Sequence, residues 1–159
     1  MVKNVFKKLG KKQKNNKGFS LVELIVVIAI MAVLVGVLAP QLIKYVEKSR
    51  EATDIQTCDN IATALKTYYA DEEVASTIED TKAVITITLS GTAVVGDSEP
   101  AIKDAGLKDA KLKGNKWNGN ITIKYNKKDG TIEYTGDSPY YHADTDQKDQ
   151  FKKGPKTTK

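Results

Sequence analysis

One apolar stretch constrains this chain more than any other feature of its sequence. Phe19 to Ala39 is 21 residues long and holds a single charged side chain, Glu23. A helix rises about 1.5 Å per residue, so this stretch can span roughly 30 Å, the thickness of the hydrocarbon core of a bilayer. A carboxylate is costly inside such a helix, which indicates a partner or a function for Glu23.

The segment before the apolar stretch is basic. Residues 1–18 contain seven Lys and no acidic residue. Without those seven, 18 of the 25 Lys and Arg residues remain, and with 20 acidic residues they give a formal charge of −2. The high isoelectric point therefore gives no support to a nucleic acid partner. Positive charge ahead of a spanning helix predicts a single-pass protein in the cytoplasmic membrane, with its N-terminus inside and its C-terminal part outside.

The sequence offers two candidate cleavage positions, one after the apolar stretch and one before it. An ordinary secretory signal has a shorter apolar region that ends at a small-residue cleavage site. Here the apolar stretch is longer, and Pro40 follows directly after its last residue, Ala39. The better candidate lies ahead of the stretch, between Gly18 and Phe19. Cleavage there would leave the whole apolar helix on the mature protein.

Residues 18–23 read Gly-Phe-Ser-Leu-Val-Glu and follow a Lys-rich leader. This combination, at the head of a spanning helix, resembles the class III signal of type IV prepilins and pseudopilins. The resemblance implies cleavage between Gly18 and Phe19 by a prepilin peptidase, which also methylates the new amine of Phe19. It further implies a helical filament of like subunits, built by an assembly ATPase and a platform protein. Glu23 would then meet the amine of a neighbouring subunit and help set axial register.

Gly36 and Pro40 lie one turn apart near the end of the apolar stretch. Proline lacks an N–H and crowds the carbonyl four residues back, and glycine weakens a helix. The pair predicts a kink or a weak point. In the pilins that this chain resembles, the corresponding stretch can lose helix when subunits pack into a filament.

After Pro40 the pattern becomes amphipathic, and we predict one helix from Phe19 to about Ala70. Residues 71–73 are expected to end it, and residues 74–81 to form a connector. Its apolar and small side chains recur every three or four residues and are expected to pack on a sheet. They are Leu42, Tyr45, Val46, Ser49, Ala52, Ile55, Cys58, Ala62, Leu65, Tyr68 and Tyr69. Charged residues, among them Glu47, Glu51 and Asp54, occupy most of the remaining positions.

The rest of the chain predicts a small antiparallel sheet. Alternating β-branched residues indicate a strand at 83–89, and Ser98-Glu99-Pro100 indicates a short helix at 100–105. Residues 120–125 and 131–135 alternate around an Asp-Gly turn and predict a hairpin. Trp117 is expected to pack on the edge of this sheet.

The predicted fold class is α+β, with a long N-terminal helix packed on a small antiparallel headpiece. Four regions are expected: a cleaved leader at 1–18, a membrane and filament-core helix at 19–40, a headpiece at 41–136, and an irregular segment at 137–159 with a disordered end. The headpiece includes the amphipathic half of the long helix.

No catalytic or cofactor-binding set emerges from the sequence, so we do not predict an enzyme. His142 is the sole histidine, and Ser138 and Asp144 are only its neighbours in sequence. Asp144, Asp146 and Asp149 could supply oxygens to calcium, as some pseudopilins do in a C-terminal loop. The EF-hand spacing is not met, however, so no metal site is predicted.

Cys58 is the single cysteine and is expected to be a small buried residue. It cannot form an intrachain disulfide. Many Gram-negative pilins close a C-terminal loop with a disulfide, so the chain more resembles the simpler pilins of Gram-positive type IV pili.

The preferred function is a structural subunit of a type IV pilus on the cell surface, used for attachment, motility or aggregation. A pseudopilin of a type II secretion or competence system would share residues 18–40. A bitopic membrane-anchored binding domain would need neither Glu23 nor cleavage at Gly18. A secreted enzyme would need catalytic residues that the sequence does not offer.

Overall fold

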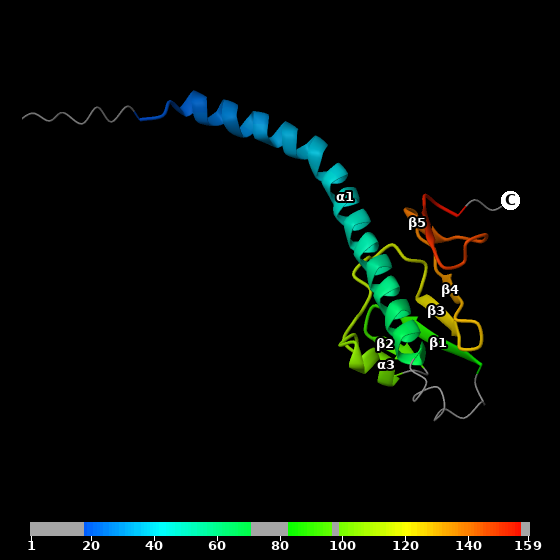
Figure 1. Cartoon of the computed structure of the whole chain (residues 1–159). Coiled ribbons are helices and arrows are strands. Elements are labelled where there is room, and N and C mark those ends of the chain that lie inside the picture. Colours follow the sequence, from blue (N-terminus) through cyan, green and yellow to red (C-terminus); the bar gives the residue numbers. More distant parts are fainter. Residues whose placement is uncertain (1–17, 71–82, 97–98, 157–159) are drawn as a thin grey trace, which may run out of the picture. The chain divides into compact units, whose positions relative to one another are not determined.

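A computed structural model of the chain describes residues 18–70, 83–96 and 99–156. The chain divides into two compact units, residues 1–41 and 42–159. Helix α1 (Leu21–Ala70) contributes its first part to unit 1 and its second part to unit 2 (Figure 1). The predicted long helix is confirmed, although it begins at Leu21 rather than Phe19. The predicted helix end at 71–73 and connector at 74–81 lie outside the described residues.

Unit 2 adds a four-stranded antiparallel sheet to α1. Its strands are β1 (Val84–Leu89), β2 (Val94–Gly96), β3 (Ile121–Asn126) and β4 (Ile132–Thr135), in the order β2-β1-β3-β4. The short helix α3 (Glu99–Asp104) lies between β2 and β3 in sequence. Strands β5 (Tyr141–Ala143) and β6 (Phe151–Lys153) form a separate two-stranded sheet. The predicted α+β class, a long N-terminal helix with a small antiparallel sheet, is confirmed.

The core of unit 2 follows from the two periodicities of its sequence. Alternate residues of the strands turn inward, so that Ile87 pairs with Ile123, and Ile123 with Tyr134. Every third or fourth residue in the last turns of α1 faces them. The fully or almost fully buried side chains are Cys58, Ile61, Ala62, Leu65, Ile85, Ile87, Leu89, Ala101, Ile102, Ile121, Ile123, Tyr125, Ile132 and Tyr134. Burying one such Ile or Leu side chain contributes about 2 kcal/mol, so this cluster is the main stabilising feature of unit 2.

The hairpin between β3 and β4 confirms the turn predicted at 126–130. Asn126 Oδ1 accepts a hydrogen bond from the N–H of Lys128, and Asp129 Oδ1 accepts one from the N–H of Thr131. Gly130 has a φ of +68°, which L-residues with a side chain rarely adopt. Local chemistry therefore sets the register of these two strands.

Strand β2 was not predicted from the sequence. It is three residues long and lies at an edge of the sheet, with Gly96 opposite Ile87. A Cβ placed on Gly96 would come within 2.4 Å of Ile87 Cδ1, so glycine allows this close approach. A strand this short has too few residues to show an alternating pattern.

The apolar stripe predicted along α1 is right in its later part and wrong in its earlier part. Cys58, Ala62 and Leu65 are buried as expected. Leu42 and Tyr45, however, are 64% and 67% exposed. The face that turns inward there instead carries Glu47, Glu51 and Asp54, whose relative exposures are 0–7%. Hydrogen-bond donors from distant segments meet these carboxylates, so hydrophobicity alone could not predict their burial.

Within the described residues 137–156, the prediction of an irregular segment is wrong, because β5 and β6 lie there. The predicted disordered end lies outside the described residues. The segment has one large apolar anchor, Phe151, which stacks on Tyr134 with the ring centroids 5.2 Å apart. The Trp117 ring meets the Phe151 ring edge-on, with the ring centroids 5.7 Å apart. Trp117 thus contacts Phe151 of β6 and Asp54 of α1, and through Phe151 it lies near β4, an edge strand of the four-stranded sheet. A single anchoring side chain leaves no periodic signal in the sequence.

Candidate processing and assembly site

The start of α1 carries the candidate processing site. Residues 18–20 are non-helical and exposed, and the side chain of Phe19 is 92% exposed. A Cβ built on Gly18 would meet nothing within 4 Å. The peptide between Gly18 and Phe19 is therefore open to an enzyme, and no contact among the described residues demands glycine at position 18.

Ser20 and Glu23 form one half of a capping box at this helix start. The N–H of Ser20 donates a 2.9 Å hydrogen bond to Glu23 Oε2, and the Ser20 carbonyl accepts the first helical bond, at 3.2 Å, from the N–H of Leu24. A Glu at the third helical position commonly satisfies the N-cap N–H in this way. The positive end of the helix dipole adds a favourable interaction with the carboxylate. Glu23 thus lies beside the amide that directly follows Phe19.

The first part of α1 exposes its apolar side chains on all sides. From Leu21 to Leu38 the large apolar side chains are 49–72% exposed. Within the described residues, α1 is the one helix long and apolar enough to cross a membrane. A helix that is apolar all round needs an apolar environment, which is either lipid or other protein.

Gly36 and Pro40 both lie inside α1, which continues through them. Because Pro40 has no N–H, the carbonyl of Gly36 lacks its usual helical donor. A Cβ on Gly36 would meet nothing within 4 Å, so packing among the residues that the structure describes does not account for the glycine. That Gly36 and Pro40 together form a kink or a weak point in the helix stays a prediction.

Sequence reasoning missed a cluster of buried carboxylates on α1 in unit 2. Asp54 accepts hydrogen bonds from the N–H groups of Lys113 (2.7 Å) and Gly114 (2.8 Å) and from Nε1 of Trp117 (2.9 Å). The spacing of these carboxylates contained a usable signal. Counting back from the apolar face at Cys58 by three or four residues reaches Asp54, Glu51 and Glu47.

The other two carboxylates of this cluster also meet donors from distant segments. Glu51 Oε2 accepts a 2.5 Å bond from Ser138 Oγ. Glu47 accepts a bond from the N–H of Asn115 and lies 3.7 Å from the Arg50 guanidinium. Together the three carboxylates hold residues 113–117 and the segment around Ser138 against α1.

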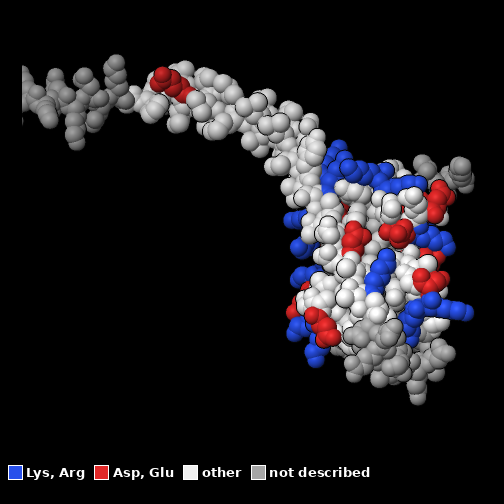
Figure 2. Space-filling model, viewed as in Figure 1, with Lys and Arg blue, Asp and Glu red and all other residues white. Residues whose placement is uncertain are grey.

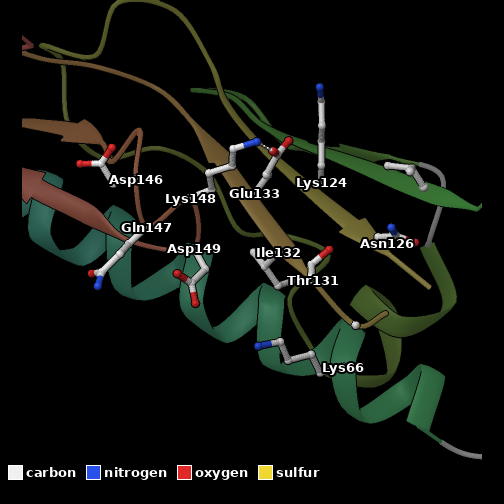
Figure 3. Close-up of a pocket in the computed structure, with 12 residues that line it drawn as sticks. Lys66, Lys124, Asn126, Thr131, Ile132, Glu133, Asp146, Gln147, Lys148 and Asp149 are labelled. Carbon is white, nitrogen blue, oxygen red and sulfur yellow. Dashed lines mark hydrogen bonds and ion pairs between the residues drawn. The ribbon is translucent and has the colours of Figure 1, made fainter. Parts of the chain in front are cut away.

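The acidic run at 144–149 lies beside a groove of about 910 Å³ in unit 2 (Figure 3). Lys148 pairs with Glu133 there, and the carboxylates of Asp146 and Asp149 point in different directions. Asp144 is 2.8 Å from Lys152 Nζ, and this ammonium lowers the pKa of its carboxyl group. Within the described part of the chain, no three His, Cys, Asp or Glu residues are placed to hold a metal ion.

The residues considered for catalysis take part in structural contacts. Ser138 binds Glu51, and His142 lies in β5 rather than in a loop, with Nδ1 2.9 Å from the carbonyl oxygen of Gly154. Cys58 is fully buried, as predicted, and burial raises the pKa of its thiol.

Comparisons with known proteins agree with this arrangement. Residues 13–39 match the prokaryotic N-terminal methylation motif. The chain is 35% identical, over 97 residues, to prepilin peptidase-dependent protein A of Clostridium perfringens. That alignment covers 59% of this chain and 67% of the relative. No solved structure matches the chain.

An apolar helix with a capped, acidic first turn, joined to an antiparallel headpiece, defines a pilin-like architecture. The chain belongs to the type IV pilin-like proteins that carry the N-terminal methylation motif.

Proposed function

We propose that this protein is a structural subunit of a type IV pilus. Its regions are a leader at 1–18, a membrane and filament-core helix at 19–40, and a headpiece that begins at 41. The chain first spans the cytoplasmic membrane with its N-terminus inside. It is then assembled into an extracellular filament of like subunits that serves attachment, motility or aggregation. The role is structural rather than enzymatic.

The observation that carries this proposal is the exposed junction at the head of an apolar helix. The methylation motif covers this junction, and the relative from Clostridium perfringens is named for dependence on prepilin peptidase. A prepilin peptidase would cut between Gly18 and Phe19 and methylate the amine of Phe19. Residues 18–20 are non-helical and exposed, which leaves this peptide accessible to such an enzyme.

Glu23 is suited to the assembly step because its carboxylate has two oxygens. Oε2 is occupied by the N–H of Ser20 within the same chain. The second oxygen remains able to accept a bond from the methylated amine of a neighbouring Phe19, since a carboxylate can accept several hydrogen bonds. In an apolar filament core such a charge pair is favourable only when both partners are present, which would fix the axial position of each subunit.

Gly36 and Pro40 would give the filament-core helix a place to lose helical structure. The carbonyl of Gly36 already lacks a donor, so melting this turn breaks fewer hydrogen bonds than melting elsewhere in α1. An assembly ATPase and a platform protein would supply the work that moves the subunit from lipid into the filament.

Two measurements test the proposal. Peptide mass analysis of surface material should find a mature N-terminus at Phe19 with a methylated amine, and an N-terminus at Met1 or near residue 40 would contradict it. Electron microscopy with an antibody to the headpiece should find long surface fibres. Labelling confined to short structures in the periplasm would instead favour a pseudopilin, which shares the motif at residues 18–40.

A further inference from the structure

Four exposed Lys residues gather at the end of unit 2 where its part of α1 begins. Two of them, Lys44 and Lys48, lie one turn apart on α1, and the other two, Lys153 and Lys156, lie at and after the end of β6. We call these four side chains the basic collar. Figure 2 shows blue side chains gathered at this end of unit 2.

Contacts within unit 2 bring the two parts of the basic collar together. Lys48 Nζ lies 5.4 Å from the centre of the Tyr140 ring. The carbonyl of Tyr140 accepts a 2.7 Å hydrogen bond from the N–H of Gly154. Lys153 and Lys156 flank Gly154, so the two-stranded sheet carries them to the same end of unit 2 as Lys48.

The charges of the basic collar are not neutralised within the described part of the chain. Lys152, in the middle of β6, is paired with Asp144 at 2.8 Å and with Asp146 at 3.9 Å. None of the four collar residues has such a partner among the residues that the structure describes. The ammonium groups therefore face solvent or an external anion.

The covalent chain keeps this end of unit 2 close to the apolar stretch. Lys44 follows Ala39 by at most about 8 Å of helix, and Lys48 by at most about 14 Å. The headgroup layer on each side of a bilayer is roughly 5–8 Å thick. Lys44 can therefore reach the headgroups, and Lys48 lies within about one Debye length of them.

The apolar side chains next to Lys44 suit an interface between lipid and water. Leu42, Ile43 and Tyr45 are 64%, 67% and 67% exposed. Tyrosine is enriched where a membrane meets water, and lysine extends its charge outward while its stem covers apolar surface. Exposed apolar side chains thus lie on both sides of Lys44 directly after the spanning stretch.

We propose that, before assembly, the basic collar binds the outer surface of the membrane through anionic lipid headgroups. Lipid phosphates would lie against Lys44 and Lys48, and Lys153 and Lys156 would bring the two-stranded sheet onto the same surface. This contact would hold unit 2 in a preferred orientation on the membrane and would be released when the subunit enters the filament. The inference rests on the proposed membrane stage but not on cleavage or on filament formation.

The test uses the full chain in nanodiscs of phosphatidylcholine, with or without phosphatidylglycerol. Insertion is first verified by co-purification with the discs. Acetylation rates of individual Lys residues are then measured by mass spectrometry. The four collar residues should react at least threefold more slowly when phosphatidylglycerol is present. About 1 M NaCl should remove the difference, because the Debye length falls to roughly 3 Å.

Lys66 and Lys103 serve as internal controls. Both are exposed, and Lys66 lies about 33 Å further along α1 than Lys44. Their acetylation rates should not depend on lipid composition. Equal protection of the controls and the basic collar, or no protection of the collar in inserted chains, would overturn the inference. A chain that fails to insert would contradict the proposed membrane stage itself.

Matched double variants separate the basic collar from general charge. The double variant Lys44→Gln, Lys48→Gln should lower the protection of Lys153 and Lys156 at least twofold. The reason is that the basic collar then keeps only two of its four ammonium groups to bind lipid headgroups. Lys66→Gln with Lys103→Gln removes the same charge from the far end and should leave the protection unchanged. Equal effects of the two pairs would show attraction by net charge rather than binding by this surface.

Discussion

The hydroxyl of Ser138 donates a 2.5 Å hydrogen bond to Oε2 of Glu51, which joins the C-terminal segment to α1 across 87 residues of sequence. The other oxygen, Oε1, is buried and has no hydrogen-bond partner among the described residues. Burial is the largest cause of the raised pKa of Glu51; the bond from Ser138 opposes it, and the carboxylates of Glu47 and Asp54 add to it. Folding therefore favours the protonated form of Glu51.

The pH dependence of stability follows from this direction. Because the folded pKa of Glu51 lies above its ordinary value of 4.5, its favourable contribution is complete below that value. The contribution is lost as the pH rises through the folded pKa. We expect Glu51→Gln to raise the free energy of unfolding by about 1 kcal/mol at pH 8 and to change it little at pH 4. Urea unfolding of the full chain in detergent, followed by the fluorescence of Trp117, would measure both.

Glu133→Gln is the matched control for this substitution. The pKa of Glu133 is lowered, first by its hydrogen bond with Lys148 and then by the charge of Lys148. Its contribution is therefore present above its ordinary pKa and lost as the pH falls. Glu133→Gln should not stabilise the protein at pH 8. A stabilisation equal to that of Glu51→Gln would trace the effect to net charge rather than to burial.

Asp54→Asn should destabilise unit 2 by about 3 kcal/mol. The carboxylate of Asp54 accepts three hydrogen bonds, from the N–H groups of Lys113 and Gly114 and from Nε1 of Trp117. An Asn amide would place a donor against at least one of these donors, and bonds to a charged acceptor contribute about 1.5–3 kcal/mol each. Trp117→Phe removes only one of them and should cost less. Equal costs would mean that the indole bond carries the whole effect.

Gly114→Ala tests how closely this segment approaches α1. A Cβ at Gly114 would lie 2.6 Å from Glu51 Cγ and 3.0 Å from Asp54 Oδ2. The segment must move away, which weakens the bonds to Asp54, and we expect a loss of about 2 kcal/mol in the free energy of unfolding. Gly91→Ala is the control, because its Cβ would meet nothing within 4 Å. Similar unfolding curves for both variants would contradict the close packing seen here.

These contacts explain which parts of the protein could be predicted from sequence. The hydrogen bond between Ser20 and Glu23 is local, since the two partners are only three positions apart in sequence. The β3–β4 hairpin is local for the same reason. The burial of Asp54 instead depends on donors 59–63 residues away. Local hydrophobicity assigns an aspartate to solvent, and only the tertiary fold supplies the donors that reverse that assignment.

Cys58 should behave as an inert packing residue. It is fully buried, and its pKa is raised first by burial and then by the charges of Asp59 and Asp54, so the reactive thiolate is disfavoured. Iodoacetamide should label it only as fast as unit 2 unfolds. Cys58→Ser should cost about 1–2 kcal/mol, because it places a hydroxyl in an apolar cluster. Rapid labelling of the native protein, or complete loss of folding in the variant, would indicate a role beyond packing.

Glu23 should be required for filament assembly but not for insertion or cleavage. Its bond to the N–H of Ser20 caps α1, and the loss of such a cap costs a helix only about 1 kcal/mol. The apolar stretch of α1 tolerates that loss in a bilayer, so Glu23→Ala and Glu23→Gln should both insert and be cut after Gly18. The charge itself is what a neighbouring methylated amine would need. We therefore expect few or no filaments from either variant when it is expressed without wild-type subunits.

Glu23→Gln keeps a side-chain oxygen that can cap Ser20 but carries no charge, so it separates the capping role from the charge-pairing role. Filaments of normal number and length from Glu23→Gln, but not from Glu23→Ala, would assign Glu23 to capping alone. Normal filaments from both would leave apolar packing as the assembly force, whereas loss of cleavage in either would move Glu23 into recognition by the peptidase.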